Sequence, residues 1–123
     1  AGVAGFIGTP PMNLLDGTWQ GDAVAVDGGG RMAVGVHSAA PRAVRLGVRP
    51  GDLRLVAADG VPAEVELVEE LGDSRIAVLH AGAQRLKLKS AEALPLAEGQ
   101  AVHLAAEPRH THLFDRASGE RLN

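Results

Sequence analysis

Apolar and polar residues alternate along most of this 123-residue chain. A period of two is typical of β-strands that bury one face, and it recurs in the segments VELVEEL, RIAVLHA, QRLKLKS and QAVHLAAE. In QRLKLKS the pattern places Leu86 and Leu88 inside and the basic residues outside. In VELVEEL it places one set of side chains on one face (Val65 and Leu67, with Glu69 in line with them) and another set on the opposite face (Glu64, Glu66 and Val68).

Turn signals separate these segments. TWQGDAVAVD and RMAVGVH flank Gly28-Gly29-Gly30, which predicts a β-hairpin because glycine readily adopts positive φ. Further turns are expected at RPGD, ADGVP, LGDS, HAGAQ and AEGQ, and short helical turns only at GTPPMNLL, RPGDL and SAEAL. The chain is therefore predicted to be an all-β barrel or sandwich. Asp59-Gly60 marks the point at which two small β units, 1–59 and 60–123, would divide.

Composition narrows the function classes. Hydrophobic residues make up 46% of the chain, but only three residues are aromatic and there is no cysteine. Disulfides and thiolate metal sites are therefore excluded, which suits the cytosol. The formal charge of −3 argues against nucleic acid as a partner. Trp19 is expected to fill the core or to anchor an interface.

No catalytic motif stands out. The chain has no GxxxxGK[ST] phosphate loop and no GxSxG elbow. The basic strip on QRLKLKS lacks neighbouring aromatic residues for base stacking, so we interpret it as an edge strand protected by charge. The acidic residues are interpreted as a solvated face rather than as a general acid–base pair. The basic residues are Arg85, Lys87 and Lys89. The acidic residues are Glu64, Glu66, Glu69, Glu70 and Asp73.

The histidines raise the question of a metal site. His110 and His112 would lie on one face of an extended segment, and Glu107 or Asp115 could complete a zinc site. The third ligand has no spacing typical of closed zinc sites, so we expect no structural metal. The three other histidines, His37, His80 and His103, stand singly in apolar segments and are expected to be hydrogen-bonded structural residues.

The first residues have the pattern of an internal stretch of a longer chain. The run AGVAGFIG is broken by glycines, ends at Pro10-Pro11 and has no basic leader. It is too short to span a membrane and does not resemble a secretory signal. Such a start is typical of a fragment or of an expressed domain.

Three ordered segments carry a family resemblance. VAGFIGTPPMNLL resembles the junction after the nucleotide-binding domain in ATPase subunits of carbohydrate-type ABC importers, such as those for maltose and sn-glycerol-3-phosphate. RLGVRPGDLRL resembles the family's GIRPEHL segment, although Gly51-Asp52 departs from its Glu-His pair. VELVEELGDSRIAVL and EPRHTHLFDRASGERL resemble its final strands. The resemblance implies a C-terminal regulatory domain of the TOBE type, an OB-like barrel spanning residues 1–123.

That family implies a mechanical function. Two ATPase subunits close on ATP and Mg²⁺ and open after hydrolysis, at the cytoplasmic face of the bacterial inner membrane, while the C-terminal domains stay paired. The implied partners are the ATPase domain itself, a second copy of the subunit and the membrane permeases. This chain carries no ATPase motif, catalytic residue or cofactor site, and we expect no activity from it alone. The alternative is a stand-alone module that binds a small oxyanion.

A candidate pairing surface lies in HLFDRASGERL. Two bulky apolar residues are flanked there by charges of both signs, as a self-complementary contact requires. In the alternative interpretation, Phe114 fills the interior of its own barrel. The candidate residues are Leu113, Phe114, Asp115, Arg116 and Arg121.

Overall fold

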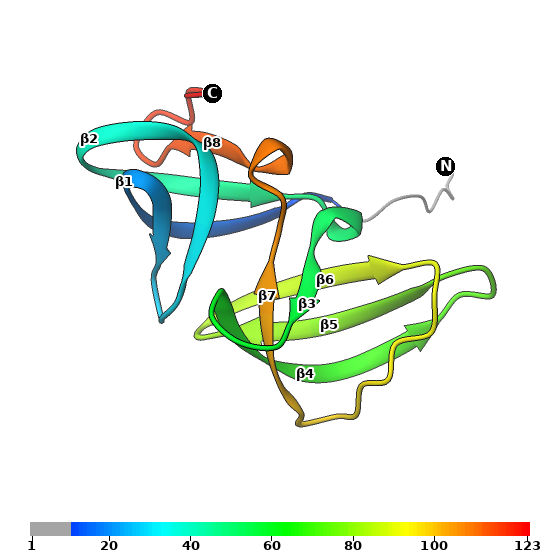
Figure 1. Cartoon of the computed structure of the whole chain (residues 1–123). Helices are drawn as coiled ribbons and strands as arrows, with labels where there is room; N and C mark the ends of the chain where they lie inside the picture. Colours follow the sequence, from blue (N-terminus) through cyan, green and yellow to red (C-terminus); the bar gives the residue numbers. More distant parts are fainter. Residues whose placement is uncertain (1–10) are drawn as a thin grey trace.

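The computed structural model describes residues 11–123, which form two antiparallel β-sheets (Figure 1). The first sheet has the strand order β1-β2-β8 and the second has β3-β7-β4-β5-β6. Across the described residues no helix is long and apolar enough to cross a membrane. The all-β prediction is confirmed. The elements are β1 (Asn13–Val26), β2 (Arg31–Val48), η1 (Pro50–Asp52), β3 (Arg54–Val56), β4 (Val61–Glu70), β5 (Arg75–Ala81), β6 (Gln84–Ser90), β7 (Ala101–Ala105), η2 (Pro108–His110) and β8 (His112–Asp115).

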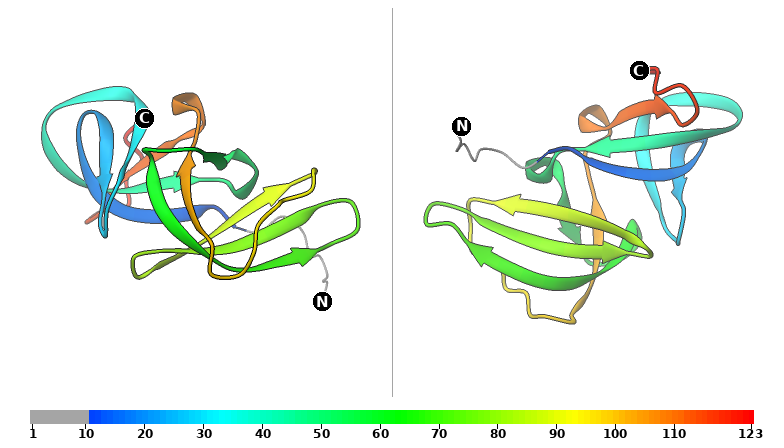
Figure 2. Two further views of the ribbon diagram at one scale, coloured as in Figure 1. Left: turned by 60° about the horizontal axis from the view of Figure 1, so that its bottom comes forward. Right: turned by 180° about the vertical axis from the view of Figure 1, so that it is seen from behind.

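Strands β1 and β2 form one long hairpin whose turn is the predicted glycine triplet. The N–H of Val26 donates to the carbonyl of Gly30 at 2.9 Å, and all three glycines of the turn have positive φ. Register irregularities between Trp19 and Ala23 bend the hairpin, which curls into a layer beside the second sheet (Figure 2). A Cβ on Gly30 would lie 2.5 Å from the carbonyl oxygen of Gly60, so the turn packs directly on the loop before β4.

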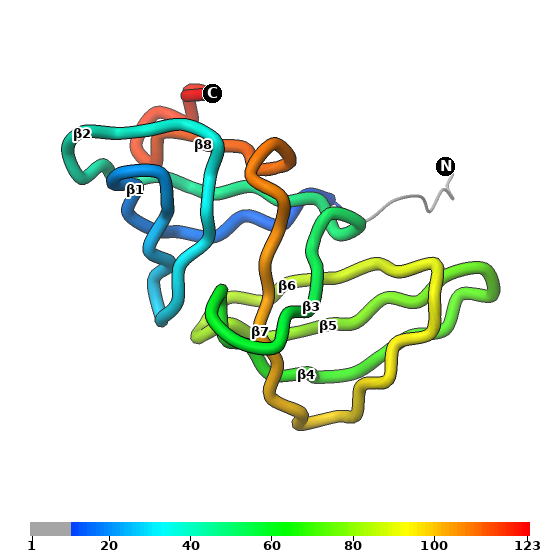
Figure 3. Tube along the Cα trace, viewed as in Figure 1, coloured from blue at the N-terminus to red at the C-terminus, as the bar shows by residue number. Residues whose placement is uncertain are grey.

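The chain passes between the two sheets twice. After β2 it enters the second sheet at β3, and after β7 it returns through η2 to place β8 beside β2 (Figure 3). Side chains from both sheets form one hydrophobic cluster. The division into units at Asp59-Gly60 remains a prediction.

Alternation correctly identifies most of the core. Leu86 and Leu88 are buried as predicted, and the largest fully buried side chains come from both sheets. Trp19 lies in the core, where its Nε1–H donates to the carbonyl of Val36 at 3.3 Å. Trp19 therefore fills the core, one of its two expected roles.

The grouping of residues on the two faces of β4 was predicted wrongly beyond Val65. The pairing of β4 with β5 shifts between Val65 and Leu67, so Glu66 is the extra residue of a β-bulge. A bulge reverses the phase of the alternation that follows it. Val68 consequently packs against the core, whereas Glu69 is exposed.

Helical turns were predicted less well than strands. RPGDL forms η1, as expected, but SAEAL contains only a bend and no helix. In GTPPMNLL, residues 13–15 already belong to β1, and residues 8–10 lie outside the described part of the chain. The turn η2 was not predicted.

Two side-chain amides join the sheets where strand pairing is absent. Asn13 donates from Nδ2 to the carbonyl of Lys87 at 2.9 Å and accepts from the N–H of Lys87 at 2.8 Å. Gln84 accepts from the N–H of Asp16 at 2.8 Å. Because β6 is an edge strand, these contacts give part of its open edge the partners that another strand would supply.

Candidate interaction surface on the outer face of the first sheet

The register of the first sheet brings three strands to one outer face. Residues directly opposite in an antiparallel pair point to the same side. Leu14 is opposite Gly47, which is itself opposite His112, and Arg45 is opposite both Asp16 and Phe114. Residues from both ends of the chain therefore share this face.

An apolar patch occupies the middle of this face. The absence of a side chain at Gly47 lets three apolar side chains converge: an added Cβ would contact Met12 Sδ and would lie 3.2 Å from Phe114 and 3.4 Å from Leu14. Leu14 is 48% exposed, unusually high for a large hydrophobic residue. A shallow cavity of about 350 Å³ runs between these side chains, bordered by Arg45. We refer to Met12, Leu14, Gly47 and Phe114 as the outer patch.

Charged groups of both signs surround the outer patch. Arg45 Nε lies 3.1 Å from Asp16 Oδ1. The guanidinium of Arg121 lies over the ring of Phe114, 5.8 Å from its centroid, and donates to His112 Nδ1 at 2.8 Å. An apolar centre with a charged rim is typical of protein–protein contacts.

The structure separates the five residues proposed from the sequence. Phe114 and Arg121 lie at the outer patch, and Asp115 borders its cavity. Leu113 points the opposite way and is fully buried in the core, so it does not belong to a contact surface. The alternative in which Phe114 fills the barrel interior does not hold, because Leu113 occupies that place.

Arg116 makes contacts within the domain and does not belong to the outer patch. Its Nη2 donates to the carbonyl of Gly17 at 2.6 Å and lies 3.5 Å from Asp27 Oδ2. Its Nε donates to the carbonyl of Val44 at 3.4 Å. Arg116 therefore ties the segment after β8 to the hairpin of β1 and β2.

The last residues cover the free edge of β8. The N–H of Leu122 donates to the carbonyl of Leu113 at 2.8 Å, and the side chain of Asn123 accepts from the N–H of Leu113 and donates to the carbonyl of Thr111. A partner can thus reach this part of the sheet through the outer face more readily than through the edge of β8.

The two histidines considered for zinc have other partners. His110 ends η2, and its Nδ1 lies 3.5 Å from Asp52 Oδ1. Burial, then the charge of Arg121, lowers the pKa of His112. Glu107 accepts a hydrogen bond from Arg109. Within residues 11–123 no three metal-ligating side chains form a group that could hold an ion.

The single histidines differ from one another. His80 pairs with Glu66, and His103 Nδ1 lies 2.9 Å from the carbonyl of Asp59, so both are hydrogen-bonded as expected. His37 is exposed, and that prediction is wrong for it. The hydrogen bond with His80, together with the charge of Arg85, lowers the pKa of Glu66.

Comparisons with known proteins agree with this architecture. A family model described as a TOBE domain matches residues 46–114, and one described as a MalK OB fold domain matches residues 8–53. The chain is 35% identical to the sn-glycerol-3-phosphate import ATP-binding protein UgpC of Jannaschia sp. (strain CCS1), over 98% of this chain and 34% of the relative. It is 36% identical to UgpC of Salmonella typhi, over 98% and 35%. The chain thus spans about a third of the curated relatives that it matches.

A solved structure of the cytoplasmic molybdate-binding protein ModG has the same fold. It superposes with a TM-score of 0.63 at 13% sequence identity, over 87% of this chain and 96% of that one. At that identity the likeness concerns the fold alone. With the two family models, it confirms the OB-like architecture, and the chain belongs to the TOBE domain family.

Proposed function

We propose that this chain is the C-terminal regulatory and dimerisation domain of the ATP-binding subunit of an ABC importer for sn-glycerol-3-phosphate or a sugar. The observation that carries the proposal is an alignment with UgpC proteins along 98% of this chain but only about a third of their length. The remaining two-thirds of such a subunit would contain the domain that binds ATP and Mg²⁺. Since this sequence lacks a phosphate loop, we expect it to hydrolyse no ATP alone.

In this proposal the domain keeps two subunits together through the transport cycle. The ATPase domains would close on ATP and separate after hydrolysis, next to the permeases at the cytoplasmic face of the inner membrane. Two copies of this chain would stay paired throughout. A two-fold contact uses the same surface on both partners. The outer patch supports this role, since its apolar centre can meet its own copy while Arg45 and Asp16 can exchange partners across the axis.

Self-association of the chain tests the pairing surface. We expect a weak dimer with a dissociation constant of tens of micromolar, which corresponds to about −6 kcal/mol. Leu14→Asp should abolish it, because a charge would enter the apolar centre. Leu71→Asp is the matched control, since Leu71 is 51% exposed and lies in the turn between β4 and β5. Sedimentation velocity over a concentration series measures both. A monomeric wild type at millimolar concentration, or equal effects of the two variants, would refute the proposed surface.

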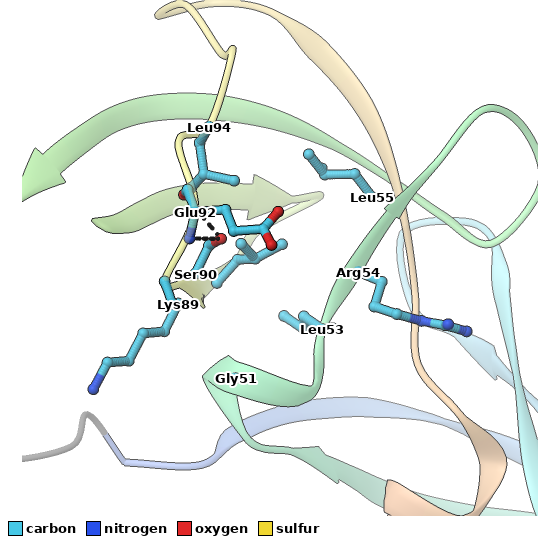
Figure 4. Close-up of a pocket in the computed structure, with 10 residues that line it drawn as sticks. Gly51, Leu53, Arg54, Leu55, Lys89, Ser90, Glu92 and Leu94 are labelled. Carbon is cyan, nitrogen blue, oxygen red and sulfur yellow. Dashed lines mark hydrogen bonds between the residues drawn. The ribbon is translucent and has the colours of Figure 1, made fainter. Parts of the chain in front are cut away.

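Oxyanion binding is the second candidate function, and one cleft favours it. Arg54, Lys89 and Ser90 line a cleft beside β6. However, Glu92 lines it too, and Figure 4 shows its carboxylate at the cleft while the charged ends of Arg54 and Lys89 point away. A carboxylate there repels an anion, so we give this function less weight. Calorimetry with molybdate and sulfate tests it, and stoichiometric binding would favour it.

A further inference from the structure

The second sheet curls so that its two edge strands lie on opposite sides of one cleft. β3 and β6 stand at the ends of the order β3-β7-β4-β5-β6. Residues of η1 and β3 form one wall, and the end of β6 with the following segment forms the other (Figure 4). The cleft has a volume of about 410 Å³, within the usual range for binding sites. We call it the seam.

The seam has an apolar floor and one acidic group. Leu53 and Leu88 are buried at its base, and Leu55 and Leu94 pack against the core while remaining half-exposed. The carboxylate of Glu92 lies at its opening (Figure 4), and no ion pair of the described residues includes it. Arg54 and Lys89 also line the seam, but their charged ends point away from it (Figure 4). An apolar side chain next to a cation placed against Glu92 therefore complements this surface.

One wall of the seam is a strand edge that no other strand of residues 11–123 covers. Within that part of the chain β6 pairs with β5 alone, and Asn13 takes the outward N–H and carbonyl of Lys87. Backbone groups two residues apart in a strand point the same way. The N–H and carbonyl of Lys89 therefore point outward beside the seam, whereas the Asn13 amide bonds to Lys87. Exposed edges of this kind are templates for an additional strand.

We propose that the seam binds an extended segment of a partner protein as an added strand. The segment hydrogen-bonds to the backbone of Lys89, places an apolar side chain on the leucine floor and sets a Lys or Arg against Glu92. Main-chain hydrogen bonds supply affinity in such β-augmentation, and side-chain pockets supply specificity. The site is separate from the outer patch and does not depend on the assignment to an importer. Because Asn13 holds the same strand edge, an added strand would lie next to the start of β1.

The test titrates the isotope-labelled chain with a synthetic peptide, acetyl-Lys-Leu-Lys-Leu-Lys-amide, and follows backbone amide shifts by NMR. We expect saturable shifts at Lys89 and Leu55, with none at Phe114 of the outer patch, which lies on β8. The same peptide with glutamates in place of lysines should bind at least tenfold more weakly. A peptide N-methylated at alternate amides should also lose at least tenfold, since it cannot pair with a strand edge.

Two variants distinguish the contribution of the Glu92 charge from the general effect of removing one acidic group. Glu92→Gln should weaken the basic peptide about threefold, as for an exposed ion pair, whereas Glu98→Gln, another exposed acid, should leave binding unchanged. Both side chains are exposed, so the variants should fold. Equal binding of the acidic and basic peptides, shifts centred on the outer patch, or no shifts at millimolar peptide would overturn the proposal. So would concentration-dependent shifts at the seam without peptide, because a second copy would then be the occupant.

Discussion

Replacing Asn13 by alanine tests how the two sheets are joined. The amide of Asn13 makes two hydrogen bonds to the backbone of Lys87, at 2.9 and 2.8 Å, and the residue is only 8% exposed. In Asn13→Ala, the N–H and carbonyl of Lys87 lose these partners where water has limited access. The edge of β6 would be left open at this point.

The expected loss follows from these two contacts. A hydrogen bond contributes about 0.5–1.5 kcal/mol net, and a buried group left without a partner costs about 1–3 kcal/mol. Because Lys87 is half-buried, water can replace part of the lost contacts. We therefore expect Asn13→Ala to lower the free energy of unfolding by about 2 kcal/mol. For a domain of this size that corresponds to a fall in Tm of about 8 °C. Urea unfolding followed by tryptophan fluorescence measures the free energy, since Trp19 lies in the core.

The control uses the same chemistry at an exposed site. Asn123 makes a similar pair of hydrogen bonds to the backbone of Leu113 and Thr111, at 2.9 and 3.0 Å, but is itself exposed. Asn123→Ala should cost less than about 1 kcal/mol. A loss below about 0.5 kcal/mol for Asn13→Ala, or equal losses for both variants, would refute the role given to Asn13.

Three further predictions concern the first sheet. Arg116→Ala should lower the free energy of unfolding by about 1–2 kcal/mol, because its hydrogen bonds to two carbonyls are lost. It should leave self-association unchanged, which sedimentation of the folded variant checks. Gly47→Ala should displace the outer-patch side chains that cover it and weaken self-association, seen in the same assay, with Phe114 shifts by NMR. His112 has a lowered folded pKa, mainly through burial and then the charge of Arg121. Its contribution to stability is therefore complete above the unfolded value of 6.5 and falls as pH drops below it. His112→Gln should flatten the decline of Tm below pH 6.5, and an unchanged slope would contradict this.

Strand positions could be predicted because most strands bury one face. Leu86 and Leu88 illustrate this: their alternation with lysines alone identified the inner face. The bulge at Glu66 could not be predicted, since VELVEEL contains no glycine or proline to signal it. The segment SAEAL has helix-forming residues, but it is an irregular connection along one wall of the seam, in which Ser90 bonds to the backbone of Glu92.

Only part of the candidate surface could be predicted from the sequence. Phe114 stood out because aromatic residues are scarce, but Leu113 is its neighbour in a strand and therefore points to the opposite face. The same rule applied to Leu14 and Leu15 would have placed one of them outside. That Leu14 meets Phe114 depends on β2 pairing with both β1 and β8, and no local pattern reveals such a pairing.

The most direct test of the proposed function measures the mass of the natural subunit by light scattering without nucleotide. We predict that the complete subunit is a dimer and that removal of residues 11–123 makes it monomeric. ATP should restore the dimer in a truncated variant that cannot hydrolyse it, because the ATPase domains would then close on their own. A truncated subunit that remains dimeric without nucleotide would contradict the account, since the ATPase domains would then hold the pair together without this domain.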